Sequence, residues 1–497
     1  MSGRLVVIGD ALLDLDLEGV AERLAPDSPV PVLDGLVEHP RPGGAALAAA
    51  MAAGDGHDVV LVTALGADDA GDRVERLLDG VDVRRLPYDG PTPVKQRVRA
   101  GGQSLLRLDS GTRPGRHLGV PEGLPELLEG AGAVLVADYG RGVAAVPALR
   151  DLLTALPRRV PVVWDPHPKG PSPVPGVRLV TPNRSEAALF AERLGVPTGG
   201  ARTMLAEVGA RADGLVERWG AQAVAVTLGA GGALLSYGAG APVVTPAPEV
   251  HCVDPCGAGD RFAVSAALAL AAGRVTVEAV HEAVQDAAGY VAAGGPASLA
   301  GASSAPEPDH RDAAQDDDRP PCEPVEQLLA AVSRRGGTVV ATGGCFDLLH
   351  AGHVATLRAA RRLGDCLVVC LNSDDSVRRL KGPSRPLVPA ADRVRVLEAL
   401  ECVDAVVVFD EDTPTEVLQR IRPHVWAKGG DYAGATFPEA AVVQEYGGQA
   451  VVLPYLEGRS TTRLLDTAAG RAEPHHRDQP SRRPADNPSS TERELLR

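Results

Sequence analysis

Residues 254–273 read DPCGAGDRFAVSAALALAAG, and they hold the clearest sign of fold and chemistry in the chain. Gly257, Ala258 and Gly259 come directly before a run of small apolar residues that predicts a buried helix. Small residues at a helix N-terminus leave several backbone N–H groups open to one point, and the helix dipole adds positive potential there. Asp260 at that point can take a proton from a hydroxyl while the amides stabilise a transferring phosphoryl group. A glycine-rich loop alone is usually a plain turn, but the aspartate and the helix favour an anion hole with a catalytic base.

Short β-branched runs alternate with Ala-, Leu- and Arg-rich helical stretches on both sides of this segment. Examples are LVVIG (5–9), VPVVWD (160–165), AVAVTLG (223–229), TVVATGG (338–344) and CLVVCLN (366–372). Runs that are buried on both faces and separated by helices predict parallel sheets of the doubly wound α/β type. Ligands in such folds bind beyond the carboxyl ends of the strands, so the residues after each run are the ones to inspect.

The length of 497 residues predicts two or three domains. Residues 301–324 are rich in Pro, Asp and Ser and have almost no large apolar residues, so they cannot bury enough surface to order themselves. We therefore expect two α/β domains, a linker and a disordered tail: 1–300, 301–335, 336–469 and 470–497.

Composition narrows the classes of partner. The 65 acidic residues outnumber the 50 basic ones, which leaves a net charge of −15 and makes nucleic acid a poor partner. The seven cysteines form no paired C-x-x-C set, which favours a reducing compartment and no structural metal. The N-terminus has no signal-peptide pattern, and the apolar run 263–273 is shorter than the ~20 residues of a membrane span. We expect a cytoplasmic protein that acts on small anionic substrates and binds no membrane.

Residues 93–108 depart from the α/β pattern. Two strand-like runs surround Gly101-Gly102, which predicts a β-hairpin. Lys95, Arg97 and Arg99 share one face of its first strand because side chains alternate along a strand. This basic face is either simply solvated or part of a β-lid that clamps an anion.

Lysine is rare in this chain. Only four of the 50 basic residues are Lys, namely Lys95, Lys169, Lys381 and Lys428. Because almost all basic residues of this chain are Arg, a position that has Lys indicates a need for a compact point charge.

The second domain has its own candidate site at GGCFDLLHAGH (343–353), which follows a strand and opens a helix. His350 and His353 are three residues apart, and Gly352 between them lets a phosphate approach the backbone. An H-x-x-H pair on a helix is often a surface accident or a metal site. Its place after a buried strand favours phosphate binding here.

The GAGD sequence resembles the ribokinase-like family of sugar kinases, and other segments agree with this resemblance. It implies that Asp260 is the general base and that Gly257, Ala258 and Gly259 form the anion hole. Gly43 and Gly44 then lie at the sugar, and Asn183 and Glu186 of an N-x-x-E motif hold Mg²⁺ through water. The implied ATP-binding residues are Asn183, Arg184, Ser185, Glu186, Thr227, Gly229 and Gly232.

Residues 9–19, 41–46 and 137–142 resemble the heptose 7-phosphate kinase branch of that family. This resemblance implies sugar-hydroxyl contacts from Asp10 and Asp14. It also implies contacts with the 7-phosphate from Lys95, Arg97, Arg99 or Arg107. The chain departs from the family pattern at Leu47, where Asn is usual, and at Arg261, where Thr is usual. Asp14 and Asp16 also imitate the D-x-D of haloacid-dehalogenase phosphatases, but the rest of that constellation is missing from the sequence.

The HAGH sequence is similar to the H-x-G-H nucleotidyltransferases. The similarity implies that His350 and His353 bind and stabilise a triphosphate without a covalent intermediate. The other implied nucleotide-binding residues are Gly343, Phe346, Asp347, Gly352, Lys381, Arg393, Lys428, Asp431, Ser460, Thr461 and Thr462.

Together the two resemblances imply a bifunctional enzyme of ADP-heptose biosynthesis that uses ATP and Mg²⁺. One half phosphorylates D-glycero-β-D-manno-heptose 7-phosphate at C1, and the other joins AMP to heptose 1-phosphate with release of pyrophosphate. A separate phosphatase has to remove the 7-phosphate between these steps. The alternatives are another sugar or polyol phosphate, CTP or GTP in the second step, or one half kept as a binding module; a homodimer is also left open.

Overall fold

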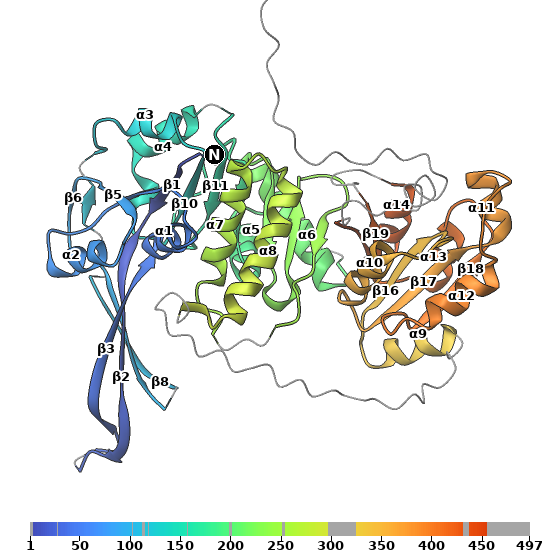
Figure 1. Cartoon of the computed structure of the whole chain (residues 1–497), viewed down its shortest axis with the longest axis horizontal. Coiled ribbons are helices and arrows are strands. Elements are labelled where there is room, and N and C mark those ends of the chain that lie inside the picture. Colours follow the sequence, from blue (N-terminus) through green and yellow to red (C-terminus); the bar gives the residue numbers. More distant parts are fainter. Residues whose placement is uncertain are drawn as a thin grey trace, which may run out of the picture.

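The computed structural model describes residues 3–296, 325–430 and 437–454, except 27, 102, 112–114, 118, 157, 198–200 and 251–253. These residues form two α/β domains and a β-lid that projects from the first domain (Figure 1). Each apolar run named above forms a strand or contains one, as the two-sided burial of such runs predicts.

The N-terminal domain, which the sequence predicts to be a kinase and which is called the kinase domain below, has a nine-stranded sheet in the order β15-β14-β13-β12-β11-β10-β1-β4-β5. Its neighbouring strands are parallel except where β14 pairs with β13 and β15. The strands are β1 (Leu5–Gly9), β4 (Val59–Thr63), β5 (Val81–Arg85), β10 (Ala133–Ala137), β11 (Val162–Asp165), β12 (Leu179–Val180), β13 (Val224–Thr227), β14 (Ala233–Ser236) and β15 (Val243–Thr245).

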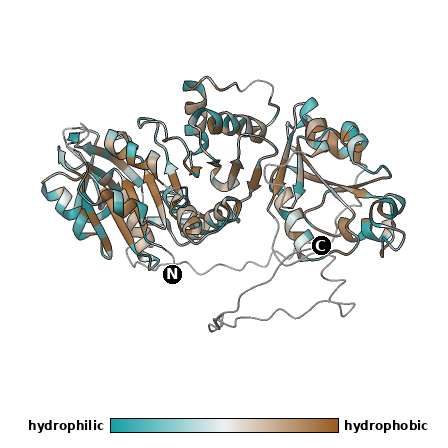
Figure 2. Ribbon diagram, turned by 90° about the horizontal axis from the view of Figure 1, so that it is seen from above, coloured by the Kyte–Doolittle hydropathy of each residue, from teal (hydrophilic) through white to brown (hydrophobic). Residues whose placement is uncertain are grey.

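Helices cover both faces of this sheet, and each face has its own apolar core. Alternate residues of β1 show the division, since Leu5 and Val7 belong to one core and Val6 and Ile8 to the other. The first core includes α1 (Ala45–Gly54), α7 (Ala258–Ala271) and α8 (Thr276–Ala292). The second includes α3 (Leu124–Glu129), α4 (Pro147–Ala155), α5 (Arg184–Arg193) and α6 (Met204–Trp219). Figure 2 shows the hydrophobic residues concentrated on the strands and on the helix faces that turn toward them.

The lid is larger than the hairpin that the sequence predicts. It is a four-stranded sheet in the order β3-β2-β7-β8, in which β7 (Val94–Ala100) and β8 (Gln103–Ser110) form the expected hairpin. β2 (Ala11–Leu24) and β3 (Pro31–Gly44) add a second, longer hairpin that extends away from the domain (Figure 1). The remaining small elements are α2 (Asp69–Arg76), β6 (Tyr88–Asp89), β9 (Arg116–His117) and the 3-10 turns η1 (Val143–Ala145) and η2 (Gly229–Gly231).

The C-terminal domain, which the sequence predicts to be a nucleotidyltransferase and which is called the transferase domain below, has a parallel five-stranded sheet in the order β18-β17-β16-β19-β20. Its strands are β16 (Val339–Gly344), β17 (Cys366–Asn372), β18 (Ala405–Phe409), β19 (Val425–Gly429) and β20 (Gln449–Leu453). Its helices are α9 (Val325–Arg334), α10 (Ala351–Arg361), α11 (Asp374–Lys381), α12 (Ala390–Glu398), α13 (Thr415–Ile421) and α14 (Pro438–Glu445).

Helix α9 corrects the expected linker. Residues 325–334 were predicted to belong to an unstructured linker, but they form a helix whose Val332 is fully buried. Its leucines Leu328 and Leu329 also pack on the transferase core. The ordered part of this domain therefore begins earlier than expected, because these apolar residues have a core to pack against.

The two sheets meet edge to edge and form one continuous sheet. Val243 of β15 lies in parallel register with Val452 of β20, and the Val452 amide donates to the Pro242 carbonyl at 2.9 Å. Beside this contact, the Arg202 guanidinium donates to the Tyr446 carbonyl at 3.0 Å. The domain interface therefore places the loop after β15 next to the transferase helices. None of the described helices has the length and apolar character needed to cross a membrane.

Candidate active sites

The first site forms at the N-terminus of α7, as the sequence predicts. Gly257 caps the helix at φ 80°, where a side chain would be strained, and an added Cβ there would lie 2.7 Å from the Tyr290 hydroxyl. The space around Gly259 is open, so a ligand can approach the backbone. Asp260 lies in the first turn and is 9% exposed. Burial raises the pKa of its carboxyl to about 6, although a hydrogen bond from Tyr139 acts to lower it.

Two residues near Asp260 were missed by the sequence interpretation. The Tyr139 hydroxyl donates to Asp260 Oδ1 at 2.5 Å. Asp165 ends β11 and accepts a hydrogen bond from the Thr181 hydroxyl at 2.8 Å. Burial raises the pKa of Asp165, and the charges of Asp260 and Glu186 raise it further, which shows that these carboxylates share one site. Their positions at the carboxyl ends of strands were the available signal, since Asp165 is the last residue of β11 and Tyr139 lies two residues after β10.

The lid adds Asp14 and Lys95 to this site. Asp14 is 8% exposed, and burial raises the pKa of its carboxyl while Lys95 and Arg97 lower it. Lys95 Nζ lies 3.8 Å from Asp14 Oδ1, and its charge also acts on Asp260. An added Cβ at Gly43 would lie 2.8 Å from Asp14 Cγ, so only glycine leaves room for this carboxylate.

The basic face of β7 is largely neutralised within the lid. Arg97 and Arg99 lie 3.7 and 3.6 Å from Asp16 carboxylate oxygens, and Arg41 donates to Asp16 at 2.6 Å. Arg107 pairs with Asp109 at 2.7 Å. The charges of these arginines are therefore partly offset by carboxylates, and their expected contact with the 7-phosphate stays a prediction.

The Asp10 carboxylate is buried and forms hydrogen bonds with backbone amides. It is 3% exposed and accepts hydrogen bonds from the amides of Tyr139, Arg141 and Val143 at 3.1, 2.9 and 3.0 Å. Gly44, which was expected at the sugar, caps α1 at φ 61° next to the Asp10 carbonyl. Asp10 thus holds the loop that presents Tyr139, and its expected contact with a sugar hydroxyl stays a prediction.

The N-x-x-E segment forms a capping box at the start of α5. Asn183 Oδ1 accepts from the amides of Ser185 and Glu186, and Glu186 Oε2 accepts from the Asn183 amide. Arg184 and Ser185 are exposed on the first turn. Thr227, at the end of β13, forms a bridge with Asn183, and Gly229 to Gly232 follow it. The predicted ATP-binding residues therefore lie together; Gly232 is required because a Cβ would be 2.0 Å from the Thr245 carbonyl.

These residues fit a Mg²⁺ ion that is bound through phosphates and water. Burial raises the pKa of Glu186, and only its Oε2 is used in the capping box. Across the described ranges, no group of three His, Cys, Asp or Glu side chains could hold a metal by itself. Mg²⁺ commonly keeps several waters and uses one or two carboxylates together with substrate phosphates, so this donor set suffices.

The two departures from the kinase family pattern have different surroundings. Leu47 packs with Met51 and Tyr290 in a small apolar cluster beside Ala258 at the start of α7. Arg261 points outward and pairs with Asp55 and with Asp286. Leu47 is therefore the departure that lies near the site, whereas Arg261 ties α7 to neighbouring helices.

A second pocket of about 430 Å³ adjoins the Tyr139 loop. It is lined by His117, Arg141 and Lys169 among others, so its charged lining is basic. Within the described part of the chain, Arg141 and Lys169 have no carboxylate partner, and both ring nitrogens of His117 are buried without a hydrogen bond. Lys169 is one of the four lysines of the chain, and sequence reasoning gave it no role.

The second candidate site forms where β16 leads into α10. His350 caps the helix, and its Nδ1 accepts from the Gly352 amide at 3.1 Å. The His350 and His353 rings are stacked with centroids 3.9 Å apart, and the Phe346 ring lies 5.3 Å from His353. Burial lowers the pKa of His353 to about 4, with further lowering by His350 and Lys381. Both imidazoles therefore lie at one helix N-terminus, and His353 is neutral near pH 7.

Asp347 and Arg393 form hydrogen bonds and ion pairs with other parts of the transferase domain. Asp347 accepts from the amides of Leu387 and Val388 at 2.7 and 3.0 Å and pairs with Arg385. Arg393 is 1% exposed and donates to three backbone carbonyls and to the Asp374 carboxylate. These hydrogen-bonding groups are thus used inside the protein, and the expected contact of the two residues with a nucleotide stays a prediction.

The two predicted lysines lie at strand and helix ends of the same domain. Lys381 is exposed at the end of α11, and its charge acts on His353. Lys428, at the end of β19, lies 3.3 Å from Glu439 and 4.8 Å from the centre of the Phe437 ring. Gly343 has no room for a side chain, since a Cβ would be 2.6 Å from Trp426. The remaining predictions, Asp431, Ser460, Thr461 and Thr462, lie outside the described residues.

Comparison with known proteins identifies the family of each domain. Residues 2–300 match the pfkB family of carbohydrate kinases, and residues 341–453 match a cytidylyltransferase-like family. The bifunctional protein HldE of Streptomyces coelicolor is 55% identical over 466 residues, which cover 94% of this chain and 96% of that protein. The HldE protein of Trichlorobacter lovleyi is 36% identical over 476 residues, with 93% and 95% covered.

Among solved structures, Arabidopsis thaliana ribokinase complexed with ribose and ATP is 22% identical, with a TM-score of 0.45. That match covers 59% of this chain and 93% of the ribokinase chain. The near full-length similarity to bifunctional relatives includes both domains in the same order. The chain therefore belongs to the family of bifunctional HldE proteins, in which a pfkB-family carbohydrate kinase domain is joined to a nucleotidyltransferase domain.

Proposed function

We propose that the two domains catalyse two ATP-dependent steps of ADP-heptose synthesis in the cytoplasm. The kinase domain phosphorylates D-glycero-β-D-manno-heptose 7-phosphate at C1. The transferase domain transfers AMP from ATP to heptose 1-phosphate and releases pyrophosphate. The observation that carries this proposal is that a single chain has a buried carboxylate at one helix N-terminus, Asp260, and stacked histidines at another, His350 and His353.

In the kinase step, Asp260 takes the proton of the C1 hydroxyl as that oxygen bonds to the γ-phosphorus of ATP. The bond from the γ-phosphorus to the bridging oxygen breaks, and ADP leaves. Amides at the start of α7 stabilise the charge on the transferring group. A pKa of about 6 leaves Asp260 mostly ionised at neutral pH while keeping it a stronger base than an exposed aspartate.

Mg²⁺ would be held by Glu186 and Asn183 through water, and it would neutralise phosphate charge when bound. The charge of Glu186 acts on Asp165 and, together with burial, raises the pKa of the Asp165 carboxyl. The capping box orients Glu186 and leaves its second carboxylate oxygen available.

The 7-phosphate fits the basic pocket beside the Tyr139 loop better than it fits the lid. Arg141 and Lys169 line this pocket without a carboxylate partner in the described part of the chain, whereas Arg97, Arg99 and Arg107 pair with aspartates. The loop held by Asp10 runs from Tyr139, at Asp260, to Arg141, at the pocket. A sugar with C1 at Asp260 can therefore extend its far phosphate toward two available cations.

In the transferase step, a phosphate oxygen of heptose 1-phosphate attacks the α-phosphorus of ATP, and the bond to the pyrophosphate oxygen breaks. A neutral His353 can still donate an N–H to a phosphate oxygen, and an arriving polyanion favours its protonated form. Lys381 adds a mobile positive charge near His353. The direct displacement requires no covalent enzyme intermediate.

The 7-phosphate has to leave between the steps, because the second acceptor is heptose 1-phosphate. We expect a separate phosphatase to remove it. Purified protein that receives heptose 7-phosphate and ATP should therefore accumulate the 1,7-bisphosphate. Formation of ADP-heptose from that mixture would contradict this part of the proposal.

Two substitutions in the full-length chain test the assignment. Asp260→Asn should lower ADP release with heptose 7-phosphate by about 10²–10⁴-fold, the usual contribution of a general base, and leave pyrophosphate release with heptose 1-phosphate unchanged. His353→Asn should lower pyrophosphate release alone, by about 10²-fold or more. ATP, CTP and GTP should be compared in the second assay. If either variant lost both activities, or kept both, the assignment of one reaction to each domain would be contradicted.

A further inference from the structure

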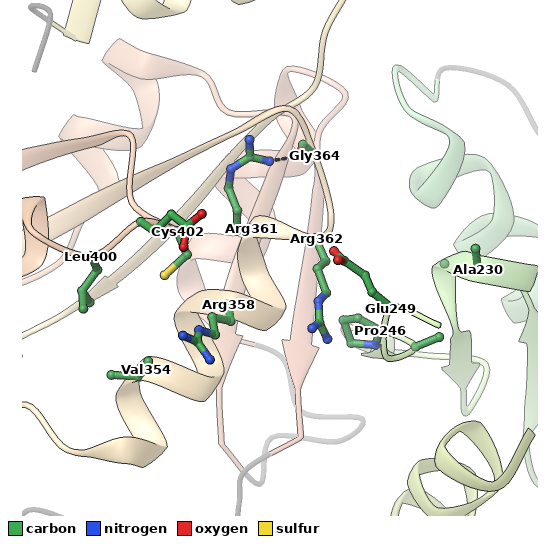
Figure 3. Close-up of a pocket in the computed structure, with 13 residues that line it drawn as sticks. Ala230, Pro246, Glu249, Val354, Arg358, Arg361, Arg362, Gly364, Leu400 and Cys402 are labelled. Carbon is green, nitrogen blue, oxygen red and sulfur yellow. Dashed lines mark hydrogen bonds between the residues drawn. The ribbon is translucent and has the colours of Figure 1, made fainter. Parts of the chain in front are cut away.

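A groove of about 700 Å³ lies between the two domains. Its kinase side consists of Ala230 and Gly231 of the turn after β13 and of the Pro246–Glu249 loop after β15. Its transferase side consists mainly of the C-terminal half of α10 and the residues that follow (Figure 3). The volume is within the range of about 300–1,000 Å³ that is typical of small-molecule sites.

Three arginines, Arg358, Arg361 and Arg362, line the transferase side of the groove. Arg361 is already used, since its Nε lies 3.1 Å from Asp404 and its Nη1 donates to the Gly364 carbonyl at 2.6 Å. Arg358 and Arg362 are exposed, and neither forms an ion pair with a described carboxylate. Figure 3 shows Arg362 extending toward Pro246 and Glu249 of the kinase domain. Two guanidinium groups are therefore available to an anionic ligand.

The kinase side of the groove belongs to the proposed nucleotide site. Thr227 bridges to Asn183, so the turn at Ala230 and Gly231 begins next to the residues expected at the ATP phosphates. A nucleotide that follows this turn away from Asn183 reaches the groove. The edge-to-edge contact of β15 and β20 then holds α10 on the opposite side of it.

We propose that the transferase domain completes the nucleotide site of the kinase domain, with Arg358 of α10 and Arg362, which directly follows α10, contacting the purine nucleoside triphosphate used by the kinase. This inference rests on the proposed kinase function. Guanidinium groups suit the ligand because they attract polyphosphate and stack on purine rings. Since His350 caps the start of α10 and Arg362 caps its end, one helix faces both nucleotide sites.

The test uses the full-length protein with Arg358→Gln and Arg362→Gln combined. The KM for ATP in the kinase reaction should rise about five- to tenfold, with kcat within about twofold, because two exposed cations are removed from an anion site. The rise should shrink at high salt. The kcat and the KM for ATP of the transferase reaction should stay within about twofold, which also shows that α10 is folded.

A matched control removes two exposed arginines of the same domain away from the groove, Arg334→Gln with Arg395→Gln. This control should change neither reaction. A second variant, Glu249→Gln, removes a groove carboxylate from the kinase side, and it should lower the KM for ATP about twofold.

The outcomes separate the two proposals. An unchanged kinase KM for ATP in both groove variants would overturn this inference and leave the proposed function intact. A kinase KM that rises equally in the Arg334 and Arg395 control would also overturn it, because the effect would then be one of net charge. Wild-type protein without kinase activity on heptose 7-phosphate would instead refute the proposed function.

Discussion

Replacing Tyr139 with Phe removes the hydroxyl that donates to Asp260 Oδ1 at 2.5 Å, and we expect this change to move the pH dependence of the kinase reaction. The hydrogen bond stabilises the ionised carboxylate and opposes the rise in pKa that burial causes. Without it, the pKa of Asp260 should rise above its value of about 6. The Tyr139→Phe enzyme should then need a higher pH to ionise its base.

The size of the shift follows from the strength of the bond. A hydrogen bond to a charged group contributes about 1.5–3 kcal/mol, and one pKa unit corresponds to about 1.4 kcal/mol. The acidic limb of kcat/KM should therefore move upward by about 1–2 pH units. The protonated carboxyl cannot accept the C1 proton, so the rate at pH 6 should fall by about five- to fiftyfold, and it should recover above pH 8.

The assay measures ADP release and gives kcat/KM for heptose 7-phosphate at pH values between 5 and 9.5. Tyr290→Phe is the matched control, because the Tyr290 hydroxyl lies near Gly257 and has no hydrogen-bond partner among the described residues. The control should keep the wild-type acidic limb. An unshifted limb in Tyr139→Phe, or an equal loss at every pH, would refute the assigned action of Tyr139 on Asp260.

Three further substitutions test other parts of the structure. Lys169→Met should raise the KM for heptose 7-phosphate about tenfold or more and leave the KM for ATP unchanged, and an unchanged sugar KM would place the 7-phosphate elsewhere. Lys381→Arg should lower transferase kcat/KM by about tenfold, because a planar fork replaces a point charge, whereas Arg395→Lys on the exposed surface should have no effect. Arg393→Lys should destabilise the transferase domain by about 2–4 kcal/mol in urea unfolding, since at least two buried carbonyls lose their donor; a midpoint equal to that of wild type would contradict this role.

Much of the fold could be predicted because its signals are local. Strands such as Leu5–Gly9 and Cys366–Asn372 are apolar at every position, as burial on both faces of a parallel sheet requires. The 93–108 hairpin follows from its glycines. Helix α9 was missed because its apolar residues are informative only when a core is present to receive them.

The catalytic groups were predictable for the same reason. Asp260, His350 and His353 lie within short motifs at helix starts, where neighbours in sequence are neighbours in space. Tyr139 and Asp165 lie more than 90 residues from Asp260, and no local pattern links them to it. The internal hydrogen-bond partners of Asp10, Asp347 and Arg393 were not predictable, because a sequence shows charged residues but not the groups that lie next to them in space.

The sequence by itself determined which segments become strands, where two phosphate-binding helices begin and which side chains there can do chemistry. Those properties depend on residues a few positions apart. Only the tertiary structure decided which basic side chains pair with carboxylates, which acidic side chains lie near Asp260 and how β15 and β20 join the two domains. Charge pairing and edge-to-edge contact depend on distances of a few ångströms between groups that are far apart along the chain, and a linear pattern does not encode those distances.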